Sequence, residues 1–388
     1  MESGENPQPI LLPLIALHGL MHIMANTLPA LSPLVKAEFQ LTHTAVGVLS
    51  FLFAAAIGLG SIPSGLLSDR CGGMRLISLC FFATTIFSGL LFFSHEVFSL
   101  SLIFICMGLF LSLYHPSALN YISHSFRFKR GKIFGVHEVG ASIGFAVTPL
   151  VAGLICHYTA WRFVYVFWMF PIVFFVFLLL RMMSSGDPTV DDAPNVNAFL
   201  RQLLKTKTTR RIYVLECLFG FVVGGTVTFL PIFLNEAKDM DPAFAVTMAC
   251  VFTGGGAIGK LAGGHFSDIV GARRVMAFGF FIVAPLFFVV PFIPLFWSIL
   301  ALALVGLIFP AVLPAIITTI SNEIEPSRTG FAFGLLMFVG YGFGAIANIL
   351  LGLVSDSFGI SRVFYPIVIA TLVGGFMNIC VPGRGCTD

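Results

Sequence analysis

Seven ionisable residues lie inside long apolar stretches of this 388-residue sequence: His18, His22, His115, His137, Glu138, Glu216 and Lys260. An ionisable side chain is costly in lipid, so a position of this kind defaults to a functional role. Histidine changes charge near neutral pH and can exchange protons. A glutamate can carry a proton, and a lysine can contact an anion. These residue types predict proton exchange together with the binding of a charged organic molecule.

His18 and His22 are four residues apart, which places them on one helical face, and Asn26 continues that face one turn later. We predict that this polar stripe contributes to substrate binding. Two alternatives remain open, because each imidazole could instead hydrogen-bond a carbonyl group of a neighbouring helix, or the pair could bind zinc. The zinc alternative is the weaker one, since no cysteine or acidic residue stands nearby at ligand spacing. We therefore expect no metal site.

His115 directly precedes Pro116 in a further apolar stretch. A proline inside a membrane helix frees a backbone carbonyl and bends the helix. Sites in transporters form at such discontinuous helices. We predict that His115 faces a cavity, binds substrate and takes part in proton coupling. The alternative is a hydrogen bond of His115 that only supports the bend.

His137 and Glu138 stand at the start of a glycine-rich apolar stretch. Adjacent residues point about 100° apart on a helix, so the two side chains need not touch. We predict that both serve proton coupling, with Glu138 as the better proton carrier. The alternative for Glu138 is a salt bridge that closes one end of the molecule. Glu216 carries less weight, because it is close to the start of its stretch and could face water.

Lys260 stands eight residues before Asp268, on the order of 12 Å along a helix. This depth allows the side chain to extend back to the membrane surface, which is the alternative to a functional role. We predict instead that Lys260 contacts an anionic part of the substrate. Four histidines and one lysine against two glutamates favour an anionic or zwitterionic molecule.

The elements that must position these residues are membrane-spanning helices, because the chain is 57% hydrophobic and only 10% charged. A soluble domain carries roughly 25% charged residues. A span needs about twenty apolar residues. Twelve segments of this size occur, near residues 10–30, 44–67, 75–93, 99–121, 132–156, 162–183, 212–234, 243–266, 274–292, 296–320, 329–354 and 362–381. We predict an all-α membrane protein with two six-helix bundles, 1–183 and 212–388, joined by a cytoplasmic linker, 184–211.

The basic residues between these segments indicate an orientation, since cytoplasmic connections carry the excess of lysine and arginine. With both termini inside, the inner connections hold sixteen basic residues and the outer ones hold only four: Lys36, Arg162, Lys238 and Arg362. We therefore expect both termini and the linker to be cytoplasmic.

The two halves repeat a short pattern. GLLSDRCGGMR, from Gly65 to Arg75, is echoed by GHFSDIVGARR, from Gly264 to Arg274, with the aspartates Asp69 and Asp268 in the same place. Parallel six-helix repeats place a substrate site between two pseudo-symmetric bundles near the membrane midplane. The repeat therefore predicts a cavity between the halves.

This duplicated loop resembles the signature of the major facilitator superfamily, and the resemblance covers the whole chain. Within the superfamily, the segments from His18 to Leu41, Tyr114 to Pro116 and Gly135 to Gly153 are most similar to the fosmidomycin-resistance group of exporters. The resemblance implies that the first span lines the central cavity and that Tyr114 belongs to the substrate site.

The duplicated loop is predicted to act as a gate at the cytoplasmic side. A carboxylate at a helix end can pair with an arginine or with the N-terminal dipole of a neighbouring helix, and such pairs hold one closed conformation. The alternative is that these charges only set the topology. The expected gate residues are Gly65, Asp69, Arg70, Arg75, Gly264, Asp268, Arg273 and Arg274.

Together these features predict a secondary active transporter that works by alternating access, with proton-coupled efflux as the leading mode. The first alternative is an importer of an organic anion or a metal chelate on the same fold. The second is a membrane-embedded enzyme, which is disfavoured because no catalytic cluster is visible. We expect no cofactor and no nucleic-acid partner. The expected partners are the substrate, protons and lipid, for a monomer in a bacterial inner membrane.

Overall fold

The computed structural model describes residues 8–125, 130–182, 205–323 and 329–379, and every regular element in these ranges is a helix. The first half contains α1 (Gln8–Ala30), α2 (Ser32–Phe39), α3 (His43–Cys71), α4 (Gly73–Leu91), α5 (Val97–Leu111), α6 (Tyr114–Ser125), α7 (Arg130–Tyr158) and α8 (Arg162–Met182). The second half contains α10 (Lys207–Glu236), α11 (Pro242–Met248), α12 (Cys250–Gly254), α13 (Gly256–Val270), α14 (Ala272–Val289), α15 (Leu295–Ile308), η1 (Phe309–Ala311), α16 (Val312–Glu323), α17 (Thr329–Phe358), η3 (Ile360–Val363) and α18 (Phe364–Ile379).

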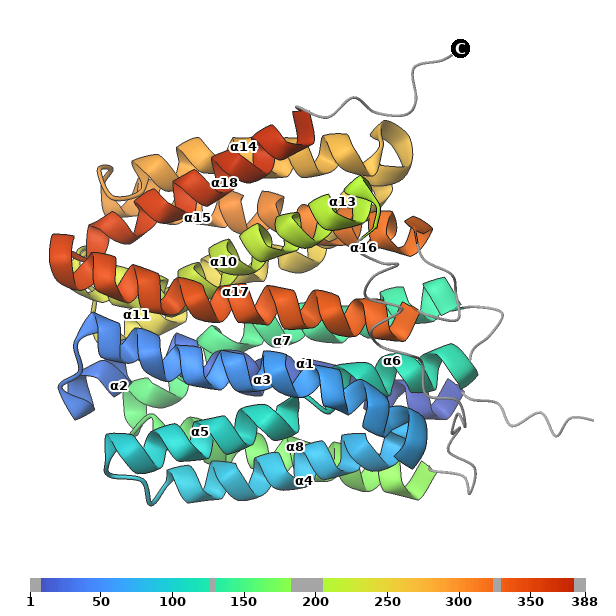
Figure 1. Ribbon diagram of the computed structural model, residues 1–388. Coiled ribbons are helices and arrows are strands. Elements are labelled where there is room, and N and C mark those ends of the chain that lie inside the picture. The colour runs from blue at the N-terminus through green and yellow to red at the C-terminus, as the bar shows by residue number, and fades with distance from the viewer. Residues whose placement is uncertain (1–7, 126–129, 183–204, 324–328, 380–388) are drawn as a thin grey trace, which may run out of the picture.

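Twelve helical segments of the described residues are long and apolar enough to cross a membrane, which confirms the predicted number. The helices of the two halves form two groups that lie side by side (Figure 1). Each half has its own buried apolar core. Most of the expected linker, its residues 184–204, lies outside the described residues. The last part of it is helical, because α10 begins at Lys207 rather than near residue 212.

Two spans are interrupted at matching positions of the two halves. The fourth span breaks between α5 and α6 at Ser112, and the tenth changes to the 3-10 helix η1 at Phe309. Proline explains the first break, because Pro116 has no N–H to donate to the carbonyl of Ser112 four residues earlier. The predicted bend before Pro116 is therefore present, and it places His115 in the first turn of a new helix.

Glycine lets helices approach closely within each half. A side chain at Gly140 or Gly144 of α7 would collide with the α1 backbone near Gly19. In the second half, Gly220 and Gly224 of α10 meet Gly340 and Gly344 of α17 in the same way. Gly19 corresponds to Gly220 at an offset of 201 residues, and Gly140 and Gly144 correspond to Gly340 and Gly344 at an offset of 200. The repeat therefore includes these glycine contacts as well as the loop pattern.

The two halves also meet each other closely, at one end of the bundle. We call this the His43 end and the opposite one the Arg70 end; α2 and α11 mark the His43 end on the left of Figure 1. Here Gly47 of α3 lies against the Asn348 carbonyl of α17, and Gly153 of α7 lies against Thr247 of α11. Ser32 Oγ also donates across the halves to the Thr228 carbonyl at 2.7 Å.

Replacing Gly47 by valine is expected to separate the halves at this end. The added Cβ would overlap the Asn348 carbonyl, a backbone atom that cannot rotate away. Overpacking of this kind costs about 1–3 kcal/mol, which shifts the conformational equilibrium roughly 5- to 150-fold away from the closed His43 end. Spin-label distances between α3 and α17 would measure the opening. Gly135→Val is the control, since no atom of the described residues lies within 4 Å of a Cβ there, and equal distances in both variants would contradict the expectation.

Candidate functional site

A cavity lies between the two halves, as the repeat predicts, and its empty space amounts to about 1080 Å³ when the part open to solvent is included. The first half contributes three ionisable residues to its wall, His22, His115 and Glu138, and the second half contributes Glu216 and Lys260. Most of the remaining wall is apolar. The cavity therefore combines a large apolar surface with a few ionisable groups that face each other from opposite halves, an arrangement typical of small-molecule sites.

Four histidines from three helices form one cluster beside this cavity. The ring centroid of His18 lies 5.0 Å from that of His22, 5.1 Å from that of His115 and 3.9 Å from that of His137. The sequence predicted roles for all four but could not show that they meet. The contacts of α1 with α7 and the start of α6 bring them together.

His18 is fully buried and is absent from the cavity wall. Its Nδ1 lies 2.8 Å from the carbonyl oxygen of His137. A carbonyl only accepts hydrogen bonds, so Nδ1 carries the proton and Nε2 of a neutral His18 has a free lone pair. The contact is the carbonyl hydrogen bond that the sequence left open as an alternative to direct substrate binding.

His137 is oriented by Tyr114. The Tyr114 hydroxyl donates to the Leu14 carbonyl at 2.8 Å, and its oxygen lies 3.0 Å from His137 Nε2. Because the hydroxyl proton is already used, Nε2 of His137 must be the donor and Nδ1 keeps the lone pair. Tyr114 is also fully buried and does not line the cavity. It acts on His137 in this structure rather than on the cavity itself.

Two imidazole nitrogens are consequently buried acceptors without a donor: His18 Nε2 and His137 Nδ1. Leaving a buried acceptor unmatched costs about 1–3 kcal/mol. Each of these two nitrogens keeps a lone pair that no described residue uses. The predicted role of the cluster in proton coupling stays a prediction.

Glu138 links this cluster to the second half. Its Oε1 lies 4.0 Å from His18 Nε2, and its Oε2 lies 3.6 Å from the ammonium group of Lys260. The side chain of Glu138 is 40% exposed, whereas that of Lys260 is 20% exposed. One carboxylate thus faces a proton acceptor of its own half and a cation of the other half.

Lys260 is placed by a broken span. The eighth span is divided into α11, α12 and α13, and Gly255, between the last two, packs against the backbone of α15 at Leu307. Lys260 follows on the second turn of α13, on the cavity wall. Its ammonium group lies 3.6 Å from Glu138 Oε2, and its predicted contact with the substrate stays a prediction.

Glu216 received little weight from the sequence but is one of the most buried carboxyl groups of the described chain, at 4% exposure. It lines the cavity, and its Oε2 has no hydrogen-bond partner among the described residues. Because Gly340 has no side chain, there is room beside it for Oε1, the other carboxylate oxygen of Glu216. Its position near a helix start suggested water contact, whereas packing of α10 against α17 removes it from water.

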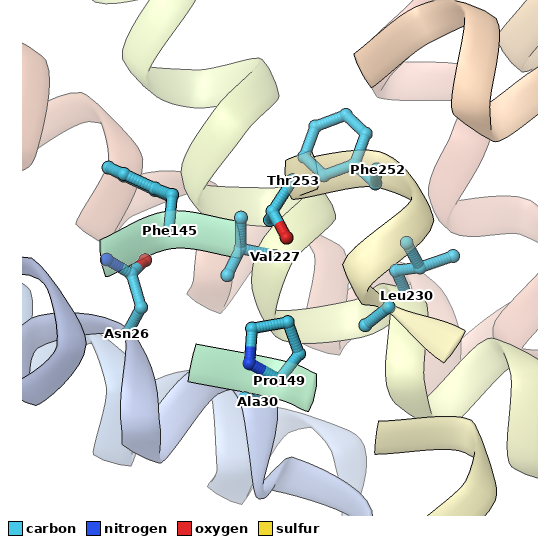
Figure 2. A pocket seen from close by; sticks show the side chains of 9 residues that line it. Asn26, Ala30, Phe145, Pro149, Val227, Leu230, Phe252 and Thr253 are labelled. Carbon is cyan, nitrogen blue, oxygen red and sulfur yellow. The ribbon is translucent and has the colours of Figure 1, made fainter. Parts of the chain in front are cut away.

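Asn26 joins the cavity to a smaller pocket, in which it faces Phe145 and Val227 (Figure 2). Its side-chain amide donates to the His22 carbonyl at 2.7 Å, one turn earlier on α1. The amide oxygen is left for a ligand. The predicted stripe of His18, His22 and Asn26 is therefore divided, with His22 and Asn26 on the cavity and His18 behind it.

The cluster also brings possible metal-ligating atoms together. The ligand atoms of His18, His22 and His115 lie within 4.8 Å of one another, and so do those of His18, His137 and Glu138. The sequence raised zinc only for the pair His18 and His22 and offered no third ligand, because His115, His137 and Glu138 come from other helices. A metal ion would use the same lone pairs that a proton would use, so the two would compete.

The duplicated loops have the same backbone shape. Gly72 and Gly271 adopt φ of 87° and 90°, a left-handed conformation that favours glycine. The Asp69 side chain lies outside the described residues. Asp268 is exposed, and no salt bridge within 4.0 Å engages it in the described part of the chain.

The remaining gate residues lie at the same end of the bundle as these loops. Arg273 donates to the Asn378 and Ile379 carbonyls at the end of α18. Arg274 is a long 3.5 Å from the Val270 carbonyl. The other members lie at the Arg70 end of α3, α4 and α13: Gly65, Arg70, Arg75 and Gly264. The predicted gating role stays a prediction.

A second group of charged residues joins the halves at the His43 end, and the sequence did not reveal it. We call it the His43 network: Lys36, His43, Glu236 and Asp356. His43 Nε2 lies 2.8 Å from Glu236 and Nδ1 lies 3.0 Å from Asp356, while Lys36 lies 2.8 Å from Glu236. These residues stand near the ends of apolar stretches, and this position is the signal in the sequence that could have pointed to them. Their pairing depends on how the halves meet.

The sequence matches the family described as Major Facilitator Superfamily over residues 14–347, with a second match over residues 243–382. The fosmidomycin resistance protein of Escherichia coli (strain K12) is 22% identical over 413 residues, covering 100% of both chains. The glycerol-3-phosphate transporter of Bacillus subtilis (strain 168) is 27% identical and covers 83% of this chain and 80% of the relative.

A solved structure has the same fold. The crystal structure of a bacterial homologue of the human lysosomal transporter Spinster, in an inward-facing and unoccupied conformation, matches with a TM-score of 0.84. The two chains are 16% identical, and the match covers 97% of each. The nucleoside transporter NupG matches with a TM-score of 0.74 at 16% identity, over 95% of this chain and 98% of NupG.

Proposed function

Because the chain belongs to the major facilitator superfamily and is a transporter rather than an enzyme, we propose that it moves a small anionic or zwitterionic organic molecule by alternating access, coupled to protons. The observation that carries this proposal is the position of Glu138. Its carboxylate is 4.0 Å from an unmatched His18 nitrogen in one half and 3.6 Å from Lys260 in the other. A change of charge at Glu138 therefore affects both the cluster of four histidines and the contact between the two halves.

The charges of the cavity favour a zwitterion over a simple anion. Lys260 offers a cation for the acidic group of the substrate. Glu138 and Glu216 offer carboxylates for an amine, and they line the same cavity. An amine bound to a carboxylate takes the place of a proton there. Substrate and proton then compete, which is the relation that exchange of one for the other requires.

Efflux is the leading direction, supported by the similarity to the fosmidomycin resistance protein. Uptake is the second candidate, and the ion pair of Glu138 with Lys260 favours it for a substrate without an amine. Protonation of Glu138 would release Lys260 to bind the anion, so proton and anion would bind together. The charge of the substrate thus decides between exchange and cotransport.

The twelve apolar segments support a multi-pass membrane protein. We propose that it resides in a bacterial inner membrane as a monomer, with both termini cytoplasmic. The His43 end is then external and closed, and the cavity is reached from the cytoplasmic Arg70 end. The duplicated loops, with Asp69 and Asp268, would form the gate that closes that cytoplasmic end in the other conformation.

Ligand binding at different pH values tests this function. A thermal-shift screen in detergent identifies ligands, and we expect these to carry both an acidic group and an amine. The dissociation constant of such a zwitterion should rise on acidification from pH 8 to pH 5, by at most tenfold per pH unit for one competing proton. Counterflow in liposomes then measures transport. A dissociation constant that falls on acidification would replace exchange by cotransport, and the absence of any counterflow would contradict the transport proposal.

A further inference from the structure

His43 lies between two carboxylates that both come from the other half of the molecule. Its Nε2 is 2.8 Å from Glu236 Oε2 on α10, and its Nδ1 is 3.0 Å from Asp356 Oδ1 on α17. A carboxylate accepts hydrogen bonds, and a neutral imidazole has only one N–H to donate. Both contacts are therefore hydrogen bonds only when His43 carries two ring protons and a positive charge.

The charges around His43 support the same state. The groups that face it are Glu236 from α10, Asp356 from α17 and, through Glu236, Lys36 from α2 at 2.8 Å. The neighbouring Lys238 donates instead to the Ile293 carbonyl at 2.7 Å. With His43 charged, two positive groups balance two negative ones. With His43 neutral, one negative charge is left without a partner.

Part of this contact does not depend on the imidazole. The Asp356 carboxylate accepts hydrogen bonds from the backbone N–H groups of His43 and Thr44, each at 2.9 Å. A carboxylate at a helix N-terminus satisfies free N–H groups and interacts favourably with the helix dipole. The beginning of α3 is thus a docking point for Asp356 at any pH at which Asp356 is ionised. The imidazole adds a contribution that exists only in its charged form.

We propose that His43 is a second proton-binding site, which stabilises the closed His43 end when it is protonated. The residue is far along the chain from Glu138 and is on no wall of the central cavity. The inference extends the proposed transport cycle. It rests on that proposal only in taking the contact of the two halves at the His43 end as a closed state of the cycle. Only a charged imidazole donates to both carboxylates of the other half, so loss of its second proton removes one of the two hydrogen bonds that His43 makes across the halves.

Thiol reactivity at Ser32 measures closure without any substrate. Ser32 is 1% exposed, and its hydroxyl bridges the halves at the His43 end. A cysteine at this position, in a chain whose native cysteines are replaced by serine, would react with a maleimide only when this end opens. Purified protein in detergent exposes both ends to the reagent, so the result is independent of membrane orientation and of transport. An exposed cysteine at Asp241 corrects for the rise of thiolate concentration with pH.

We expect the corrected rate of labelling to rise on the order of tenfold between pH 5.5 and pH 8. His43→Arg, which stays charged, should remain slow throughout, and His43→Gln, which cannot become charged, should be fast throughout. The slow rate in His43→Arg shows that this variant is folded and that a charge at position 43 is sufficient for closure, and size-exclusion chromatography with circular dichroism checks that His43→Gln is folded. A flat wild-type rate, or the wild-type pH response in both variants, would overturn the proposal. Such a result would leave substrate counterflow, and hence the transport proposal, untouched.

Discussion

Glu138→Gln is expected to abolish the accumulation of substrate that a pH gradient drives, while exchange of substrate across a liposome membrane survives. The amide keeps the size of the carboxylate and most of its hydrogen bonds but cannot gain or lose a proton. A gradient of one pH unit provides about 1.4 kcal/mol per proton, enough for roughly tenfold accumulation. In the variant this ratio should fall to about one. Uptake of labelled substrate into liposomes, with and without the gradient, measures it.

Glu96→Gln is the matched control, because Glu96 is an exposed residue before α5 and is absent from the cavity wall. It should accumulate substrate as the wild type does. Loss of both accumulation and exchange in Glu138→Gln would give Glu138 a structural role. Full pH-driven accumulation in that variant would move the proton carrier to His18, His22 or His137.

Lys260→Met should raise the dissociation constant of the substrate about 10- to 150-fold. A hydrogen bond to a charged group is worth about 1.5–3 kcal/mol, and methionine keeps the length of the chain without the charge. The pH dependence of the remaining binding should persist, since Glu138 and the histidine cluster are still present. Titration calorimetry in detergent measures both quantities.

The variant also leaves Glu138 without its cation, so the pair needs a separate assessment. The double variant Lys260→Met with Glu138→Gln closes a double-mutant cycle, and the two effects should be clearly non-additive because the atoms are 3.6 Å apart. Lys205→Met, in an exposed turn before α10, should bind as the wild type does. An unchanged dissociation constant in Lys260→Met would remove Lys260 from the substrate site.

The architecture was predictable because it depends on composition and repetition. Twelve apolar segments, a duplicated loop and a proline next to His115 gave the number of spans, the two halves and the bend at Ser112. Each of these signals is local or repeats at a fixed distance along the chain. The start of α10 at Lys207 was missed, because Lys207, Arg210 and Arg211 resemble a polar linker although they continue a helix beyond the apolar part.

The site was predictable only as a set of residue types. Five of the seven ionisable residues chosen from the sequence line the cavity, and lipid makes any such residue unusual, but their roles stay predictions. It could not separate His22, on the cavity wall, from His18, which is buried behind it, because both share one helical face. The hydrogen bonds that fix the protons of His18 and His137 involve backbone carbonyls. The His43 network depends on the contact of α3 with α10 and α17, which no spacing within one segment encodes.

The glycine contact of α1 with α7 bears on how the protein is made. Gly19 and Gly140 are 121 residues apart, so the glycine face of the first helix has no partner until the fifth span has been synthesised. The equivalent contact of α10 with α17 spans Gly220 to Gly340, entirely within the second half. Domains generally fold as units during synthesis. Each half can therefore complete its own glycine contacts, and a ribosome that stops after α8 would leave a bundle in which the contact of α1 with α7 can already form.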